Sequence, residues 1–309
     1  MSLLELKKVS LHFQNKQLKK IVNLYQKNYK NGGSSGFGDY LRGCYCLFQV
    51  SKLLGLEFDM DVSNHPMCEF LENHKEKNPT VNYDNIHRFH NDNYVVIDTK
   101  EMKTNSCKFL NDFIDFLNRQ DCKSYSLFSN AFPIYSNFRK IQSEPRDFVR
   151  NKLMPNEQMK RNIELRLQNL CVQEKHFSII HVRCGDEYLL DNNSSIQTNK
   201  FTKIANSIEK NIIQSPSLKN RKYVILSDNN QMKLLLKQKF PQFIIQIKQM
   251  THLGESQNHT NESMMHTLLD FYTMSKSNFV VSLSSYNWGS GFSEWCAVTY
   301  RIPYLKIIY

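Results

Sequence analysis

Short apolar segments alternate with amphipathic ones through the C-terminal half of this sequence. Runs of β-branched and aromatic residues predict buried strands over 177–183, 223–228, 243–247, 278–284 and 303–308. Between them, the spacing of apolar residues predicts helices over 199–213, 230–240, 262–276 and 291–300. Strands and helices that alternate in this way form right-handed βαβ units and a parallel sheet covered on both faces. The pattern therefore predicts a Rossmann-like domain over residues 172–309.

The N-terminal half, residues 1–171, alternates less regularly. The same criteria predict helices over 39–54, 105–119 and 142–170, the last one broken near Pro155, and strands over 55–61, 94–98 and 124–129. The polar segment 63–92 is expected to be a long loop with short helices. In a chain of 309 residues, two α/β halves of similar length favour two domains with a cleft between them.

The charge balance limits the possible partners without choosing among them. A formal net charge of +11 fits a phosphate-bearing small molecule, a nucleic acid or a membrane surface. No nucleic-acid-binding motif accompanies this charge, and no apolar run approaches the ~20 residues of a transmembrane segment. The N-terminus lacks a secretory pattern and the 8 cysteines are scattered, so we expect a cytoplasmic protein with reduced thiols. Removal of an N-terminal anchor and the oligomeric state are left open.

The carboxyl ends of the first two C-terminal strands carry polar motifs. His-Val-Arg-Cys-Gly-Asp at 181–186 places Arg183 where ligands of open parallel sheets bind. A guanidinium suits a diphosphate because it is always charged and binds in a bidentate manner. The structural alternative is an ion pair between Arg183 and Asp186. Ser227 and Asp228 end the next strand, where Asp228 either contacts a ribose or base, or caps the following helix.

A third polar segment follows the fourth strand. Hydroxyls and backbone amides at Ser284 and Ser285 precede a helix, an arrangement that binds anions. Tyr286 and Trp288 are suited to stacking on a sugar or a base. The alternative is an ordinary turn between strand and helix, with Trp288 filling the core.

A glycine-containing segment begins the first long helix of the N-terminal half. Gly36 and Gly38 permit close approach of the backbone to a ligand, while Asp39 and Arg42 lie in the first turns of the helix. The segment is neither a complete dinucleotide fingerprint nor a P-loop, since no G-K-[ST] follows. Asp39 as a helix cap and Arg42 as a surface charge are the alternatives.

Two groups of residues invite a metal assignment that we do not make. The histidines at 65, 74, 87 and 90 lie in a polar segment without a recognised ligand spacing. The pair Asp59 and Asp61 forms a D-x-D sequence, but it lies away from the strand ends where a nucleotide is expected. We therefore expect no metal site.

The order of these motifs resembles the fucosyltransferase superfamily, which contains α1,2-, α1,6- and protein O-fucosyltransferases. Residues 181–186 are similar to its H-x-R-x-G-D signature, and 262–288 to the D-[LF]-x-x-[ML]-S…S-S-x-S-W stretch of the α1,2 group. Residues 36–39 resemble a G-x-G-N loop, with Asp39 in place of Asn. The resemblance implies a GT-B-like α/β fold of two Rossmann-like domains facing a central cleft. Residues 1–171 would form an acceptor-side domain, and 172–309 a nucleotide-sugar-binding domain.

The resemblance also implies an activity: an inverting, metal-independent glycosyltransferase that transfers fucose from GDP-fucose to a glycan hydroxyl, without a cofactor. Arg183 would stabilise the diphosphate leaving group, and Asp39 is the first candidate for a general base, before Glu294. The expected donor-binding residues are His181, Asp186, Ser227, Asp228, Ser284, Ser285, Tyr286, Gly36, Gly38 and Arg42. Two alternatives remain: a GT-B transferase that uses another nucleotide sugar, and a non-catalytic protein that binds nucleotides or glycans.

Overall fold

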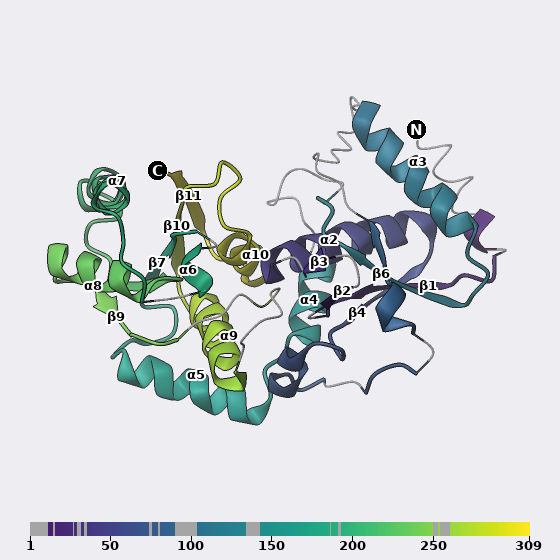
Figure 1. Ribbon diagram of the computed structural model, residues 1–309, viewed down its shortest axis with the longest axis horizontal. Helices are drawn as coiled ribbons and strands as arrows, with labels where there is room; N and C mark the ends of the chain where they lie inside the picture. Colours follow the sequence, from purple (N-terminus) through teal and green to yellow (C-terminus); the bar gives the residue numbers. More distant parts are fainter. Residues whose placement is uncertain are drawn as a thin grey trace. The chain divides into compact units, whose positions relative to one another are not determined.

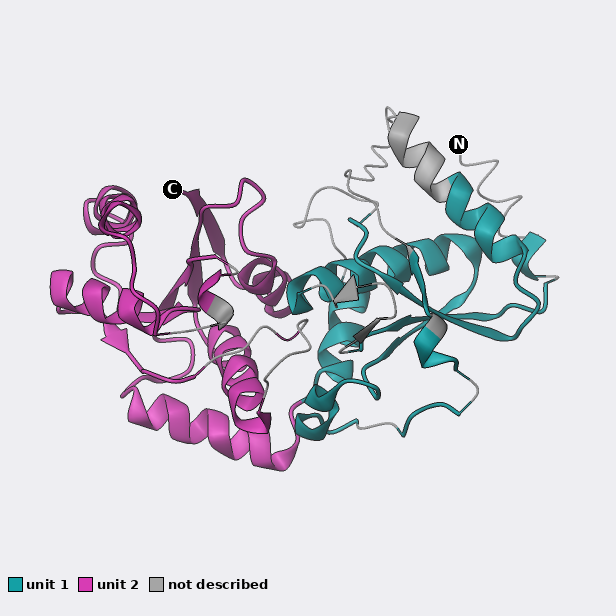
Figure 2. Ribbon diagram, viewed as in Figure 1, with its two compact units in different colours: residues 1–154, 254–256 teal, residues 155–253, 257–309 magenta. Residues whose placement is uncertain are grey.

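The chain folds into two compact α/β units (Figure 2). Unit 1 contains residues 1–154 and 254–256, and unit 2 contains 155–253 and 257–309. The computed structural model describes residues 12–14, 16–26, 28–29, 32–33, 36–73, 76–79, 81–89, 104–133, 143–185, 187–190, 193–249, 253 and 260–309.

The units divide between residues 154 and 155, earlier than the sequence-based boundary at 171/172. The segment in question contains helix α5 (Glu157–Asn169), which packs against α9 (Asn261–Ser275) of unit 2. A buried ion pair between Arg166 and Asp270 joins the two helices. Sequence spacing gives no indication of this long-range contact, which is why the predicted boundary lies too late in the chain.

Unit 2 is built on a parallel sheet of five strands, as predicted. Its strands lie in the order β11 (Tyr304–Ile308), β10 (Phe279–Ser284), β7 (Ser178–Arg183), β8 (Tyr223–Ser227) and β9 (Ile244–Ile245). Strand β7 lies in the centre, where every position from Ser178 to Val182 is buried, as suits a strand covered on both faces.

The helices cover both faces of this sheet (Figure 1). They are α5, α6 (Glu187–Leu190), α7 (Thr198–Ile208) with the π-helical turn η4 (Glu209–Ile213), α8 (Asn230–Lys239), α9 and α10 (Gly291–Tyr300). Alternation along β7 sends Ile180 and Val182 into a core with α7 and α8. His181 points to the opposite face, where its ring centroid lies 5.8 Å from that of Phe292 in α10.

Unit 1 has a smaller parallel sheet of four strands. Their order is β4 (Glu57–Asp61), β1 (Lys20–Leu24), β6 (Ser124–Ser129) and β5 (His87–Phe89). The sequence did not predict β1 or β5, and the strand predicted over 94–98 lies outside the described residues. An antiparallel pair, β2 (Asn28–Tyr29) and β3 (Gly32–Gly33), stands apart from the sheet.

The helices of unit 1 are close to those predicted. They are α2 (Phe37–Leu54), α3 (Thr104–Asn118) and α4 (Ser143–Lys152), with 3₁₀ turns η1 (Pro66–Phe70) and η2 (Tyr83–Asn85). Helix α2 packs on the sheet through Gly43, where a Cβ atom would overlap with the carbonyl oxygen of Ser129. Among the described helices of both units, none has the length and apolar content that crossing a bilayer requires.

Candidate functional site

The polar residues at the carboxyl ends of the strands of unit 2 are in register with one another. In the register of the sheet, Ser284 of β10 is the partner of Arg183 in β7, and Ser227 of β8 is the partner of Val182. Because the strands are parallel, Arg183, Asp228 and Ser284 reach the same edge of the sheet. This is the edge where the sequence placed a ligand.

Asp228 holds the carboxyl ends of the two neighbouring strands together through hydrogen bonds. Its carboxylate accepts Nη1 of Arg183 at 2.7 Å, the amide of Cys184 at 2.8 Å and the amide of Gly185 at 3.3 Å. The side chains of Arg183 and Asp228 are 14% and 5% exposed, so the ion pair is largely shielded from water. Arg183 thus forms an ion pair with the residue that ends the neighbouring strand, while Asp186, the alternative partner, lies outside the described residues.

The N-cap of helix α8, which follows β8, is Asn229, the residue after Asp228. Oδ1 of Asn229 accepts the amide of Met232 at 2.8 Å, which is the N-cap hydrogen bond of α8. Of the two roles considered for Asp228, the capping role therefore belongs to Asn229. Ser227 is buried, and its Oγ accepts the amide of Asn229 at 3.2 Å, so it shapes the same turn.

The backbone around Arg183 is fixed from two sides. Nζ of Lys200 in α7 donates to the carbonyl of Cys184 at 2.7 Å, and the hydroxyl of Tyr309 donates to the carbonyl of Arg183 at 2.8 Å. Gly185 has φ +141°, a conformation that other residues rarely adopt. Sequence reasoning missed Lys200 and Tyr309. Tyr309 could have been found, because it follows β11, whose carboxyl end must reach the same edge.

Cys184 fills the space below this turn. Burial raises the pKa of its thiol well above the ordinary value, and its Sγ lies 3.5 Å from Oγ of Ser227. A thiol in this environment stays protonated and packs as a small apolar group.

The imidazole of His181 is buried two residues before Arg183 in β7. Burial lowers its pKa to about 4, so the ring is neutral at physiological pH. Its Nδ1 is buried and has no hydrogen-bond partner. A buried nitrogen without a partner normally marks a position that another group fills, which fits a ligand-contacting role.

Further buried charges lie in unit 2, and the sequence did not predict them. The pair Arg166 and Asp270 joins α5 to α9, while Nε and Nη1 of Arg166 have no partner. Lys233 of α8 is buried and donates to Oδ1 of Asn230 at 3.1 Å and to the carbonyl of Gln246 at 3.3 Å. Burial lowers the pKa of Lys233, and the Asp270 carboxylate opposes that shift.

The segment after β10 forms a turn that exposes two aromatic rings. Ser284 is buried and its Oγ accepts the amide of Tyr286 at 3.1 Å, whereas Ser285 is exposed. The rings of Tyr286 and Trp288 stack, with centroids 5.1 Å apart and planes within 13°. Trp288 is 61% exposed, so the alternative that placed it in the core is wrong. The buried tryptophan of this region is Trp295.

The candidate residues of unit 1 gather in the first turns of α2. Gly36 precedes the helix and Gly38 is buried within it. Asp39 and Arg42 form an ion pair at 3.0 Å, in which the Asp39 side chain is 38% exposed. Arg42 also donates Nε to the carbonyl of Asn130 at 2.6 Å, and its guanidinium lies 4.0 Å from the ring centroid of Phe132. Arg42 is therefore anchored by its neighbours, unlike a free surface charge.

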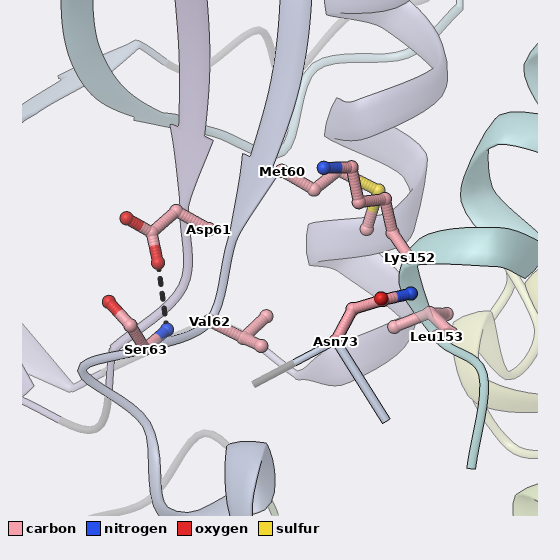
Figure 3. Close-up of a pocket in the computed structure, with 7 residues that line it drawn as sticks. All are labelled: Met60, Asp61, Val62, Ser63, Asn73, Lys152 and Leu153. Carbon is pink, nitrogen blue, oxygen red and sulfur yellow. Dashed lines mark hydrogen bonds between the residues drawn. The ribbon is translucent and has the colours of Figure 1, made fainter. Parts of the chain in front are cut away.

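The D-x-D sequence of unit 1 is engaged in structural contacts. Asp59 forms ion pairs with Lys20 at 2.9 Å and Lys152 at 2.6 Å, while Asp61 accepts the amide of Ser63 at 2.8 Å. The adjacent pocket, lined by Asp61, Ser63 and Lys152 among others, has room for about one water molecule (Figure 3). Across the part of the chain that the structure describes, no three His, Cys, Asp or Glu side chains gather as metal ligands would.

Sequence comparison finds no match for this chain among models of protein families or among curated proteins. Comparison with solved structures does find similar folds. FUT1 of Arabidopsis thaliana, a mutant in complex with GDP, is 11% identical, with a TM-score of 0.53, covering 98% of this chain and 74% of that one. Fucosyltransferase NodZ from Bradyrhizobium is 14% identical, with a TM-score of 0.50, covering 90% of this chain and 92% of that one. This chain therefore has a GT-B-like α/β fold, built from two units that each contain a parallel sheet, and it shares that fold with these two fucosyltransferases.

Proposed function

We propose that this protein is an inverting, metal-independent glycosyltransferase that transfers fucose from GDP-fucose to a glycan hydroxyl. One observation carries the proposal: Arg183, Asp228 and Ser284 converge at the carboxyl edge of a parallel sheet. Such an edge is where open α/β sheets bind nucleotides. The fold similarity to FUT1 with GDP bound and to fucosyltransferase NodZ supports the choice of nucleotide and sugar.

Arg183 is the group that stabilises the leaving diphosphate in this proposal. As the sugar is transferred, negative charge grows on the β-phosphate, and a preorganised cation lowers the barrier. Asp228 and the carbonyl contact of Tyr309 hold Arg183 in place before the donor arrives, so little reorganisation is needed. Loss of one such contact typically lowers the rate by about 10²–10³-fold.

The nucleoside is assigned to the buried polar groups behind Arg183. His181 is neutral, and its unpartnered Nδ1 provides a position for a base or a phosphate oxygen. Asp228, which also holds Arg183, is the residue assigned to the ribose or guanine. Ser285 and the backbone amides after β10 complete the anion site, and Tyr286 packs on the donor.

The acceptor side is assigned to unit 1. Asp39 is the proposed general base, because its carboxylate is partly exposed in the first turn of α2 and Arg42 restrains it. Gly36, Gly38 and Arg42, in the same part of unit 1, are assigned to the donor. Inversion requires the acceptor hydroxyl to attack opposite the leaving group, and a base within about 3 Å of that hydroxyl would remove its proton. Glu294 of α10 is the second candidate for this role.

A thermal-shift experiment with nucleotides tests the proposal. Purified protein is heated with GDP, UDP, GDP-fucose or UDP-sugars, without added metal and with EDTA present. A ligand at 100 times its Kd stabilises by about 2.7 kcal/mol, which is readily measured. We expect stabilisation by GDP and GDP-fucose only.

The other outcomes reject the proposal in distinct ways. Stabilisation by UDP compounds alone would indicate a transferase for another nucleotide sugar. Binding of GDP-fucose without any slow hydrolysis or transfer would indicate a non-catalytic binding protein. In a companion assay, Asp39→Asn tests only the base: transfer at the wild-type rate would remove Asp39 from the mechanism and leave the donor site in place.

A further inference from the structure

Trp288 is an unusually exposed aromatic residue that the donor site does not use. It is 61% exposed, more than any other large hydrophobic residue in the described part of the chain. Single exposed apolar side chains are common on protein surfaces, so exposure alone indicates nothing. The contacts of the surrounding turn and the stacking of the Trp288 ring are the additional observations.

The turn that carries Trp288 is fixed by three polar contacts. Oγ of Ser284 accepts the amide of Tyr286 at 3.1 Å, and the amide of Gly289 donates to the carbonyl of Tyr286 at 2.8 Å. Nζ of Lys306 in β11 donates to the carbonyl of Trp288 at 3.4 Å. Gly289 has φ +86°, a left-handed conformation that glycine adopts without strain.

The two stacked rings form a rigid aromatic platform, defined here as Tyr286 and Trp288. One face of the indole is covered by Tyr286, at 5.1 Å between centroids and with planes within 13°. In this stack one face of the indole lies against Tyr286, and much of the remaining indole surface is open to solvent. A rigid aromatic group loses little conformational entropy when it binds a ligand.

The platform lies at the edge of the sheet where the donor is proposed to bind. Ser284, four residues before Trp288, is the register partner of Arg183. The groups assigned to the donor, among them His181, Asp228 and Ser284, are buried, whereas Trp288 lies further out and carries no charge. A flat, neutral aromatic surface suits the apolar C–H face of a neutral sugar ring better than a diphosphate.

We propose that the exposed face of Trp288 binds a neutral sugar ring of the acceptor glycan and positions it beside the donor site. This inference rests on the proposed function for the identity of the second substrate. It adds a residue that recognises the acceptor, and it identifies the ligand class as a neutral pyranose.

Tryptophan fluorescence makes the proposal directly measurable. The chain has 2 tryptophans, and the other one, Trp295, is 1% exposed. Changes in emission on adding a saccharide therefore report on Trp288. Lactose, N-acetyllactosamine, cellobiose and chitobiose are titrated in turn, with and without saturating GDP. We expect saturable change with at least one of them.

Calorimetric titrations of variants complete the test. Trp288→Ala should weaken binding of that saccharide about tenfold, as alanine substitution does for aromatic stacks on bases, while GDP binding changes less than about twofold. Trp288→Phe should retain most of the affinity. Leu165→Ala, at a residue of unit 2 that is 55% exposed, is the matched control and should bind like wild type.

Two results would overturn the inference. One is that no saccharide of the panel changes the emission or shows heat of binding. The other is that Trp288→Ala weakens GDP-fucose binding and leaves saccharide binding intact, which would place the donor's sugar on the platform. Failure of wild type to bind GDP, with saccharides still bound through Trp288, would reject the proposed function and retain the platform.

Discussion

Removal of the Asp228 carboxylate should destabilise unit 2 and weaken nucleotide binding together. In Asp228→Ala, Arg183 loses its ion pair with Asp228 while only 14% exposed, and the buried amides of Cys184 and Gly185 lose this acceptor. Breaking a buried ion pair costs about 3–5 kcal/mol, and each buried donor left unpaired costs about 1–3 kcal/mol. Because Arg183 retains some access to water and the turn can relax, we expect a loss of about 3–5 kcal/mol.

Urea unfolding followed by tryptophan fluorescence is the assay, since both tryptophans lie in unit 2 and unit 1 contributes no signal. Asp228→Asn should lose about half as much, because its amide oxygen still accepts one hydrogen bond. Glu174→Ala breaks an exposed ion pair with Lys276 and should change stability by less than about 1 kcal/mol. If Asp228→Ala lost no more than this control, Asp228 would not organise the strand ends.

Three further predictions concern buried groups. His181 has its pKa lowered to about 4 from 6.5, so the unfolded state takes up the proton first as pH falls. The free energy of unfolding should therefore keep its full value above pH 6.5 and fall by up to about 3 kcal/mol as the pH approaches 4. Urea unfolding at a series of pH values measures this dependence, which should be weaker in His181→Asn. Gly43→Ala should cost at least about 2 kcal/mol by calorimetry, because α2 must move away from Ser129. Asp270→Ala leaves Arg166 charged and buried, so it should lower the free energy of unfolding by about 3–5 kcal/mol. The double variant with Arg166→Met should recover most of that loss, and losses that simply add would refute the pairing.

The sheet of unit 2 was predictable because each of its strands is a short run rich in β-branched, aromatic or other apolar residues between turn signals. Strand β1 of unit 1 was not, because its short run Ile-Val-Asn-Leu follows two lysines and contains Asn23. Asn23 is buried, and its polar groups are satisfied by backbone hydrogen bonds to Ser129 at 3.1 and 2.9 Å. That compensation comes from a residue far along the chain, so no local pattern in the sequence reveals it.

The candidate site was predictable to the level of strand ends. A parallel sheet brings its carboxyl ends to one edge, so Arg183, Asp228 and Ser284 could be placed together from the sequence. The pairing of Arg183 with Asp228 depends on strand order, and local sequence favours the nearer Asp186. The outward position of Trp288 depends on the turn at Gly289, which no periodicity describes.

The central claim is that Arg183 binds the diphosphate of a GDP-sugar at the carboxyl edge of unit 2. Arg221 provides a matched control, because it precedes β8 at the opposite edge of the same sheet and lies 4.7 Å over the ring of Phe279. The direct measurement is the Kd of GDP, by calorimetric titration in EDTA, for wild type, Arg183→Ala and Arg221→Ala. We predict that Arg183→Ala binds GDP at least about tenfold more weakly, the loss of one charged contact, while Arg221→Ala binds like wild type. Equal affinity of Arg183→Ala and wild type, or an equal loss in both variants, would contradict this assignment.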